Sequence, residues 1–200
     1  MSFEIIVITP EVDSPKETDV ICRLFEMGLQ VLHLRKPNTI IDKLRKYIQR
    51  IPKQFHKRII LHSHYDLIKE FNLKGAHLTE KVRESVKEIN TLKRKKTKTI
   101  STSFHSTKEI LNNNINYEYV FLSPVFDSIS KQGYKSNFTS DELTLFLKKT
   151  KQRVIALGGI DDKNSKILKQ LNFSGAAVLG FIWESKTPVE NYKKLISKIK

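Results

Sequence analysis

The sequence has little cysteine, which excludes one way of stabilising a fold. Cys22 is the only cysteine of the chain, so no internal disulfide can form. It lies at helical spacing with Ile21, Leu24 and Phe25. This spacing favours a small core side chain over a reactive thiol.

Long apolar runs are also missing. No stretch approaches the roughly 18 residues of a membrane-spanning helix. Residues 1–10 lack the charged start and the small-residue cleavage site of a secretory signal, so a cytoplasmic location is expected. The G-x-S-x-G, P-loop and G-x-G-x-x-G motifs are absent as well, which argues against hydrolases, NTPases and dinucleotide-binding proteins.

The chain does have enough apolar sequence for a core. It contains 200 residues, of which 39% are apolar, and no stretch reads as a linker between domains. We therefore expect a single domain over residues 1–200.

Positive charge is in excess, with 36 Lys and Arg against 21 Asp and Glu and a formal net charge of +15. Such a charge attracts nucleic acids, anionic membranes and phosphorylated metabolites alike. The densest basic cluster, residues 93–98, falls where a helix should end, and cations there complement the exposed carbonyl groups. No basic cluster carries the interleaved aromatic residues of a single-strand binding surface. We therefore expect neither nucleic-acid nor membrane binding.

Apolar runs of strand length alternate with segments of helical spacing along the whole chain. The expected strands are 3–9, 30–34, 58–61, 75–78, 97–101, 119–122, 154–157 and 176–179. The expected helices are 18–27, 40–51, 65–71, 83–92, 107–112, 140–149, 162–171 and 189–199. Several strands are continuously apolar, as a parallel sheet covered on both faces requires. Eight such units predict an α/β fold, the (β/α)8 TIM barrel, with an open doubly wound sheet as the alternative.

Polar residues concentrate where the expected strands end. In a barrel these positions face one shared mouth. Five of the six histidines are among them, and His56 is the exception. The set comprises His33, Arg35, Lys36, His62, Ser63, His64, His77, Thr79, Glu80, Ser103, His105, Ser123, Ser128, Ser130, Lys131, Gly158, Gly159, Leu179 and Gly180.

Glycines at the ends of the last two strands suit a phosphate. Gly158, Gly159 and Gly180 leave backbone amides bare, so that an anion can approach them closely. In barrels the loops after strands seven and eight often bind phosphate. A glycine pair also occurs in simple tight turns, and the two interpretations stay open.

Two further features point to an anion. Ser128, Ser130 and Lys131 form an S-x-S-K segment in a long loop, where hydroxyls beside an ammonium suit a phosphate or diphosphate as well as they suit a solvated loop. Arg35 ends a buried parallel strand and needs a partner there. That partner is either a carboxylate such as Glu80 or a bound anion.

The histidines give weaker evidence. His62 and His64 share one face of a strand end, but no further ligand at the usual spacing completes a metal site with them. His77 lies between Ala76 and Leu78 and is expected to be a core imidazole with satisfied hydrogen bonds. No metal site is expected from this pattern.

Six segments together resemble one family. They are L-H-L-R-K (32–36), G-A-H-L-T-E (75–80), S-T-S-F-H-S (101–106), L-S-P-V-F-D-S-I-S-K (122–131), A-L-G-G-I (156–160) and G-A-A-V-L-G (175–180). Through them the chain resembles the thiamine phosphate synthase/TenI superfamily nearly from end to end. The resemblance implies a (β/α)8 barrel of thiamine biosynthesis. The synthases of this superfamily join an aminopyrimidine methyl diphosphate to a thiazole phosphate and release diphosphate.

The resemblance also implies roles for single residues. Arg35 and Lys131 would contact the diphosphate, with Ser103 and Ser130 donating hydrogen bonds nearby. The thiazole phosphate would be held by Ser128 and by the amides of Gly158, Gly159, Leu179 and Gly180. His33 stands where the family usually has a substrate-contacting glutamine, and Pro37 replaces a common basic residue.

The sequence departs from the family at the metal site. The synthases hold Mg²⁺ with an acid after the third strand and another beyond the G-x-H motif, and the matching residues here are Ser63 and Val82. Because Mg²⁺ requires hard oxygen ligands, the usual site cannot form, and Glu80 substitutes at most in part. No cofactor is certain, and Mg²⁺ is expected only if synthase activity survives. Without it, cationic side chains alone must stabilise the departing diphosphate.

Two alternatives follow from this loss. TenI-type members of the superfamily are similar to thiazole tautomerases, which need a proton shuttle and no metal. Their histidine after the sixth strand is matched here by Pro124, so His62, His64 or His105 would have to replace it. The other alternative is a non-catalytic protein that binds thiazole phosphate. Small phosphorylated thiazole and pyrimidine ligands are the expected partners, and homo-oligomerisation is left open.

Overall fold

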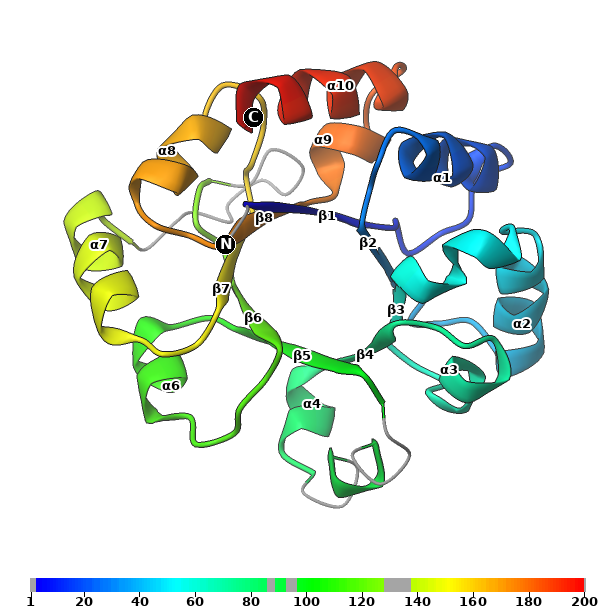
Figure 1. Ribbon diagram of the computed structural model, residues 1–200, viewed down its shortest axis with the longest axis horizontal. Helices are drawn as coiled ribbons and strands as arrows, with labels where there is room; N and C mark the ends of the chain where they lie inside the picture. The colour runs from blue at the N-terminus through cyan, green and yellow to red at the C-terminus, as the bar shows by residue number, and fades with distance from the viewer. Residues whose placement is uncertain (1–2, 86–88, 93–96, 128–137, 200) are drawn as a thin grey trace.

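Eight parallel strands form a closed barrel in chain order, and β8 pairs with β1 to complete the ring (Figure 1). The computed structural model describes residues 3–85, 89–92, 97–127 and 138–199. The strands are β1 (Glu4–Ile8), β2 (Val31–Leu34), β3 (Ile59–Leu61), β4 (Gly75–Leu78), β5 (Thr99–Phe104), β6 (Tyr119–Leu122), β7 (Val154–Leu157) and β8 (Gly175–Val178). The predicted (β/α)8 barrel is confirmed.

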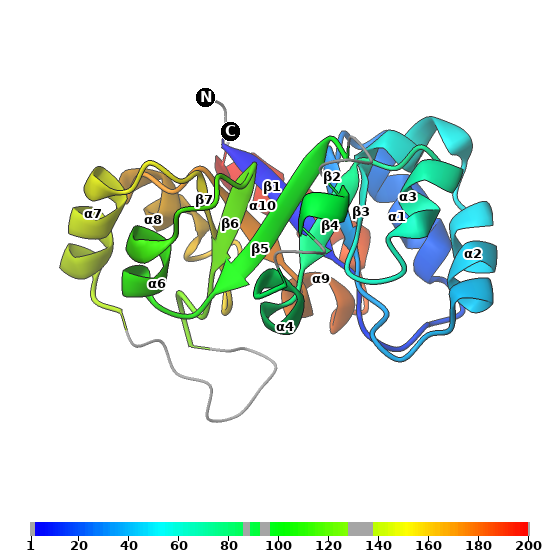
Figure 2. The same ribbon diagram turned by 90° about the horizontal axis from the view of Figure 1, so that it is seen from below.

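Helices surround the barrel on its outside (Figure 1). They are α1 (Glu17–Glu26), α2 (Ile41–Gln49), α3 (Asp66–Glu70), α4 (Glu80–Arg83), α6 (Thr107–Asn112), α7 (Ser140–Lys149), α8 (Ser165–Gln170), α9 (Gly180–Trp183) and α10 (Pro188–Ile199). A 3₁₀-helix, η1 (Lys53–Arg58), precedes β3. Figure 2 shows the barrel from the side, with α4 and α9 near the end to which β5 points. All eight strands are parallel, so their carboxyl ends share that end of the barrel.

Alternation along the strands produces two apolar layers. Ile6 and Ile8 of β1 belong to a buried cluster with Phe121 and Ile155, which fills the inside of the barrel. Val7, between them in sequence, belongs to the larger cluster that packs the sheet against the helices. Both faces of the sheet are therefore buried, and this accounts for the continuously apolar strands.

Most element boundaries differ from the prediction by one to three residues, and three differences matter for the site. The helix predicted at 83–92 is not one helix, because α4 ends at Arg83 and residues 89–92 are helical again. Strand β5 runs on to Phe104, so Ser103 lies on the strand and not in the loop after it. Helix α9 has only four residues, which is too few to show a helical period in the sequence.

Cys22 lies partly buried on α1, and burial raises the pKa of its thiol. A raised pKa leaves less of the reactive thiolate, in line with the structural role that its spacing predicts. In the part of the chain that the structure describes, no helix is both long and apolar enough to span a bilayer.

Candidate functional site

A cavity of about 360 Å³ lies at the carboxyl ends of the strands. Most of the predicted mouth residues line it: Arg35, His62, His77, Thr79, Glu80, Ser103, His105, Ser123, Gly158, Gly159, Leu179 and Gly180. Apolar side chains such as Phe121 and Leu157 complete its wall. Apolar walls with a few convergent polar groups are typical of a small-molecule site.

Four predicted mouth residues do not line the cavity: His33, Lys36, Ser63 and His64. His33 is fully buried, so the structure does not place it where a ligand in the cavity would touch it. The Nε2 atom of His64 lies 2.7 Å from the carbonyl oxygen of Thr39. Ser128, Ser130 and Lys131 lie outside the described residues, and their roles stay predictions.

The glycine pair after β7 forms one wall of the cavity. Gly158 and Gly159 have positive φ angles of 99° and 63°, which glycine adopts without strain. The backbone after β6 packs directly against them, so that a Cβ on Gly159 would lie 2.2 Å from the carbonyl oxygen of Asp127. Within the described part of the chain, neither amide N–H of the pair finds an acceptor. Unpaired amides at a cavity wall are the donors that an anion requires.

Arg35 reaches the cavity from the end of β2. Its backbone N–H donates to Thr9 Oγ1 at 2.9 Å, which ties the end of β2 to the end of β1. Its guanidinium lies 2.5 Å from a carboxylate oxygen of Glu11, and the side chain is 38% exposed. The partner is thus Glu11 and not Glu80, the carboxylate expected from the sequence. Glu11 lies in the loop that follows β1.

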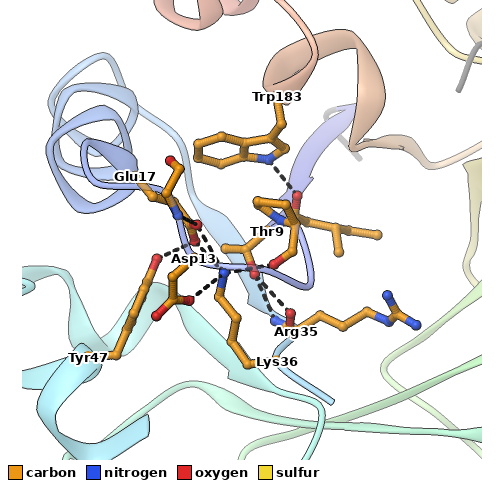
Figure 3. A network of polar contacts seen from close by, with 10 residues as sticks. Thr9, Asp13, Glu17, Arg35, Lys36, Tyr47 and Trp183 are labelled. Atoms are coloured by element: carbon orange, nitrogen blue, oxygen red, sulfur yellow. Dashed lines mark hydrogen bonds and ion pairs between the residues drawn. The ribbon is translucent and has the colours of Figure 1, made fainter. Parts of the chain in front are cut away.

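Lys36 does not face the mouth, and that prediction is wrong. Its side chain is only 1% exposed. Its Nζ donates to the carbonyl oxygen of Pro10 at 2.7 Å and lies 2.9 Å from carboxylate oxygens of both Asp13 and Glu17. Figure 3 shows the side chain of Arg35 extending away from this network. Consecutive residues at a strand end point in opposite directions, so one faces the ligand and the other the helix layer.

Three histidines from adjacent strands meet at the bottom of the cavity. His33 Nδ1 lies 2.9 Å from His62 Nε2, and His33 Nε2 lies 2.6 Å from the Tyr119 hydroxyl. The ring of His77 stacks on the ring of His62 with centroids 4.4 Å apart. Its two nitrogens each lie 2.9 Å from a serine hydroxyl, that of Ser101 and that of Ser103. His77 is therefore the satisfied core imidazole that was predicted.

Burial sets the protonation of these three rings. It lowers the pKa of His33 and of His62 well below the usual value, and neighbouring imidazoles lower both further. Burial, together with the charge of Arg35, lowers the pKa of His77 to about 3. These three imidazoles are therefore neutral at neutral pH, beside the guanidinium of Arg35.

The donors at this mouth do not fit Mg²⁺. Neither Ser63 nor Val82 lines the cavity, and Val82 has no polar side-chain atom. Among the described residues, Glu80 is the one carboxylate in the lining, and it lies 3.9 Å from the Arg83 guanidinium. Mg²⁺ takes oxygen ligands at short distances in a near-octahedral arrangement, and imidazole nitrogens are poor substitutes.

Fold and cavity together define a (β/α)8-barrel protein with a candidate site at the carboxyl ends of its strands. Residues 5–182 match the model of a family described as thiamine monophosphate synthase. The chain therefore belongs to the thiamine monophosphate synthase family.

Individual relatives agree with this assignment. A thiamine-phosphate synthase of Streptococcus suis (strain 98HAH33) is 24% identical over 196 residues, which span 94% of this chain and 84% of that protein. A thiamine-phosphate synthase of Limosilactobacillus reuteri (strain DSM 20016) is 30% identical over 78 residues, and the match spans 39% of this chain and 36% of that protein.

Solved structures extend the likeness over the whole chain. The crystal structure of thiamine phosphate pyrophosphorylase from Bacteroides thetaiotaomicron is 33% identical, with a TM-score of 0.83, and the match covers 98% of this chain and 97% of that one. Thiamine phosphate pyrophosphorylase from Pyrococcus furiosus has a TM-score of 0.80 over 98% of this chain and 95% of that one. Its 18% identity shows the fold alone.

Proposed function

We propose that this chain binds a thiazole phosphate in the cavity and joins it to an aminopyrimidine methyl diphosphate, releasing diphosphate. Membership of the family supports the pathway. The single observation that carries the proposal is the meeting of Arg35 with the amides of Gly158 and Gly159 around one cavity. Two anions need two groups of donors, and these follow two separate strands, β2 and β7, at one mouth.

In this proposal separate groups of residues bind the negative charges of the two substrates. The amides of Gly158, Gly159, Leu179 and Gly180 hold the phosphate of the thiazole. Arg35 faces the diphosphate, whose negative charge increases as its bond to the pyrimidine methylene breaks, and a fixed cation stabilises that charge. Ser103 donates a hydrogen bond from β5. Lys131, outside the described residues, is proposed as a second cation.

The donor set predicts a slow synthase with little use for Mg²⁺. Synthesis would depend on Arg35 and Lys131 where other members use a divalent ion. The test combines purified protein with both substrates, with and without MgCl₂, and measures thiamine phosphate by chromatography. Formation of product supports the proposal, and its absence in both conditions rejects the synthase reaction.

Thiazole isomerisation is the second candidate, and the imidazoles at the mouth favour it. His62 and His105 line the cavity, whereas His64 does not, so the first two are the candidates for a relocated base. The low pKa of the partly buried His62 makes it a weak base, and this favours His105. NMR of the unrearranged thiazole phosphate incubated with protein would show its conversion. A His105→Gln variant should lose that conversion if His105 is the base.

A binding protein without catalysis would give a third result. Thiazole phosphate at 100 times its dissociation constant would then stabilise the fold by about 2.7 kcal/mol through mass action, and so raise the melting temperature. Neither reaction would occur.

Lys131→Ala should weaken diphosphate affinity while the fold stays intact. A cytoplasmic location, the single domain and the absence of nucleic-acid binding stay predictions.

A further inference from the structure

The three histidines at the bottom of the cavity bring nitrogen atoms together from three adjacent strands. His33 lies on β2, His62 directly after β3, and His77 on β4. One nitrogen from each ring lies within 4.8 Å of the other two. In sequence these residues are 29 and 15 positions apart, so only the closure of the barrel assembles them.

The closest pair lies at hydrogen-bonding distance, where one nitrogen can donate an N–H to the other. His33 Nδ1 and His62 Nε2 are 2.9 Å apart, and two nitrogen lone pairs at this distance repel unless a proton or a metal ion lies between them. With Zn–N bonds of about 2.0–2.1 Å, two ligands of a tetrahedral ion lie roughly 3.3 Å apart. The observed separation is within a few tenths of an ångström of that value, so small ring movements would admit an ion.

Hydroxyl groups fix the far sides of two of the rings. Tyr119 Oη holds Nε2 of His33, and Ser101 Oγ holds Nδ1 of His77. In metal sites the second nitrogen of a ligating histidine is usually held in this way, which sets the tautomer and the orientation of the ring. Ser103 holds the other nitrogen of His77, and since Ser103 lines the cavity its hydroxyl can turn away when that nitrogen binds an ion.

The donor set selects the kind of ion. Three neutral imidazoles suit Zn²⁺, Co²⁺, Ni²⁺ or Cu²⁺ and give little affinity for Mg²⁺ or Ca²⁺. Three protein ligands leave a fourth position open, and His62 and His77 both line the cavity, so that position faces the space where a ligand would bind. Arg35 and the glycine amides border the same space, and a phosphate oxygen or a water molecule could complete the coordination.

We propose that His33, His62 and His77 form a binding site for one divalent transition-metal ion, of which Zn²⁺ is the representative, with an open coordination position toward the cavity. The site differs in position and ligand type from the Mg²⁺ site of two acids that the resemblance implies. Metal binding at this site requires neither the thiazole nor the pyrimidine substrate, so it can be tested independently of the proposed function.

The test measures metal binding directly, without any substrate. Protein treated with EDTA and dialysed is titrated with CoCl₂, followed by visible absorption, and with ZnSO₄, followed by calorimetry. We expect one ion per chain, a Co²⁺ spectrum of a four-coordinate nitrogen-rich site, and no displacement by excess MgCl₂. Absence of stoichiometric Co²⁺ and Zn²⁺ binding would mean that the three rings share only protons, and would overturn the proposal.

Variants locate the ion. His62→Asn changes the least buried of the three ligands and should weaken Zn²⁺ binding at least tenfold. Tyr119→Phe removes only the hydroxyl that orients His33 and should weaken it about 10- to 100-fold. His105→Asn is the matched control, because His105 lines the same cavity outside the cluster, and it should bind as the wild type does.

Unchanged affinity in His62→Asn would place the ion elsewhere and reject the site. Circular dichroism establishes that each variant is folded. Imidazole nitrogen resonances of ¹⁵N-histidine wild-type protein provide the same test without any substitution. Zn²⁺ should shift three of the six rings, and a shift of His64 or His105 in their place would contradict the assignment.

Discussion

The ammonium of Lys36 lies 2.9 Å from the carboxylate of Glu17, and neither side chain is more than 1% exposed. Asp13 and the carbonyl of Pro10 complete the surroundings of the ammonium, and the hydroxyl of Tyr47 donates to the same Glu17 carboxylate (Figure 3). The network joins the start of α1 to the end of β2. Because Lys36 follows Arg35 directly, it also fixes the backbone from which the guanidinium reaches the cavity.

Removal of the Lys36 ammonium should lower the free energy of unfolding. Lys36→Met leaves the buried Glu17 carboxylate without its cation, and breaking a buried ion pair from one side costs about 3–5 kcal/mol. Urea denaturation should therefore show a lower free energy of unfolding with an unchanged m-value. The double variant Lys36→Met/Glu17→Leu removes both charges and should recover part of the loss. A single variant within about 1 kcal/mol of wild type would contradict the buried pair.

Arg35 is expected to carry much of the affinity for diphosphate. Arg35→Gln keeps the length of the side chain roughly but removes the charge, and charged hydrogen bonds contribute about 1.5–3 kcal/mol each. Affinity for inorganic diphosphate, measured by calorimetry, should fall about 10- to 100-fold. Arg45→Gln is the control, because Arg45 pairs with Glu70 outside the cavity.

Glu11 should weaken the affinity for diphosphate, whereas Arg35 strengthens it. Its carboxylate competes with an incoming anion for the Arg35 guanidinium, so Glu11→Gln should tighten diphosphate binding at low ionic strength. Weaker binding in this variant would show that Glu11 positions the guanidinium and does not compete for it.

Gly159 is expected to be intolerant of any side chain. A Cβ there would lie 2.2 Å from the carbonyl oxygen of Asp127, and the φ angle of 63° adds strain. Gly159→Ala should lower the free energy of unfolding by more than about 1 kcal/mol and weaken phosphate binding at the same wall. Gly28→Ala provides the comparison, because Gly28 also has a positive φ but nothing within 4 Å of its Cβ position. Equal losses in the two variants would refute the steric argument.

Periodicity was enough to predict the eight strand–helix units, which favour a barrel. Runs such as 119–122 are apolar at every position, and segments such as 140–149 have helical spacing, so each unit can be recognised locally. The same reasoning placed the glycine pair at a strand end. Elements of four residues, such as α9, are set by tertiary contacts, here the bond from the Trp183 indole N–H to the carbonyl of Ile8 at 2.7 Å.

The histidine cluster could not be predicted, because it depends on strand register. His33 pairs with Ile60 of β3, and His77 pairs with Ser101 of β5. A shift of one residue in any of these strands would turn a ring to the helix layer. The sequence alone offered two histidines two positions apart, and one of them, His64, points elsewhere. Spacing along the chain therefore could not indicate His33 and His77 as the partners of His62.

Charge partners were missed for a related reason. Arg35 and Lys36 are neighbours in sequence, yet Arg35 pairs with the exposed Glu11 and Lys36 with the buried Glu17. Both carboxylates come from the segment after β1, about 20 residues away along the chain. Only the adjacency of β1 and β2 in the barrel brings this segment to them.

Tyr117 carries a hydroxyl whose removal should stabilise the fold. The Oη atom is buried and has no hydrogen-bond partner in the part of the chain that the structure describes, while the ring packs edge-on to Phe104 with centroids 6.4 Å apart. An unsatisfied buried polar group costs about 1–3 kcal/mol. Tyr117→Phe keeps the ring and removes that cost, so the midpoint of urea unfolding should rise.

Tyr119→Phe is the matched comparison, because Tyr119 lies two residues further along and its hydroxyl is 2.6 Å from His33 Nε2. This variant leaves a buried imidazole nitrogen without its partner, so the midpoint should fall. For a chain of this length, each kcal/mol corresponds to about 2–4 °C in melting temperature, which calorimetry resolves. A lower melting temperature for Tyr117→Phe would mean that its hydroxyl has a partner after all, such as a buried water molecule. The opposite signs expected for two tyrosines so close in sequence make this pair a direct test of the hydrogen bonding of their two buried hydroxyl groups, one outside the strands and one inside the barrel.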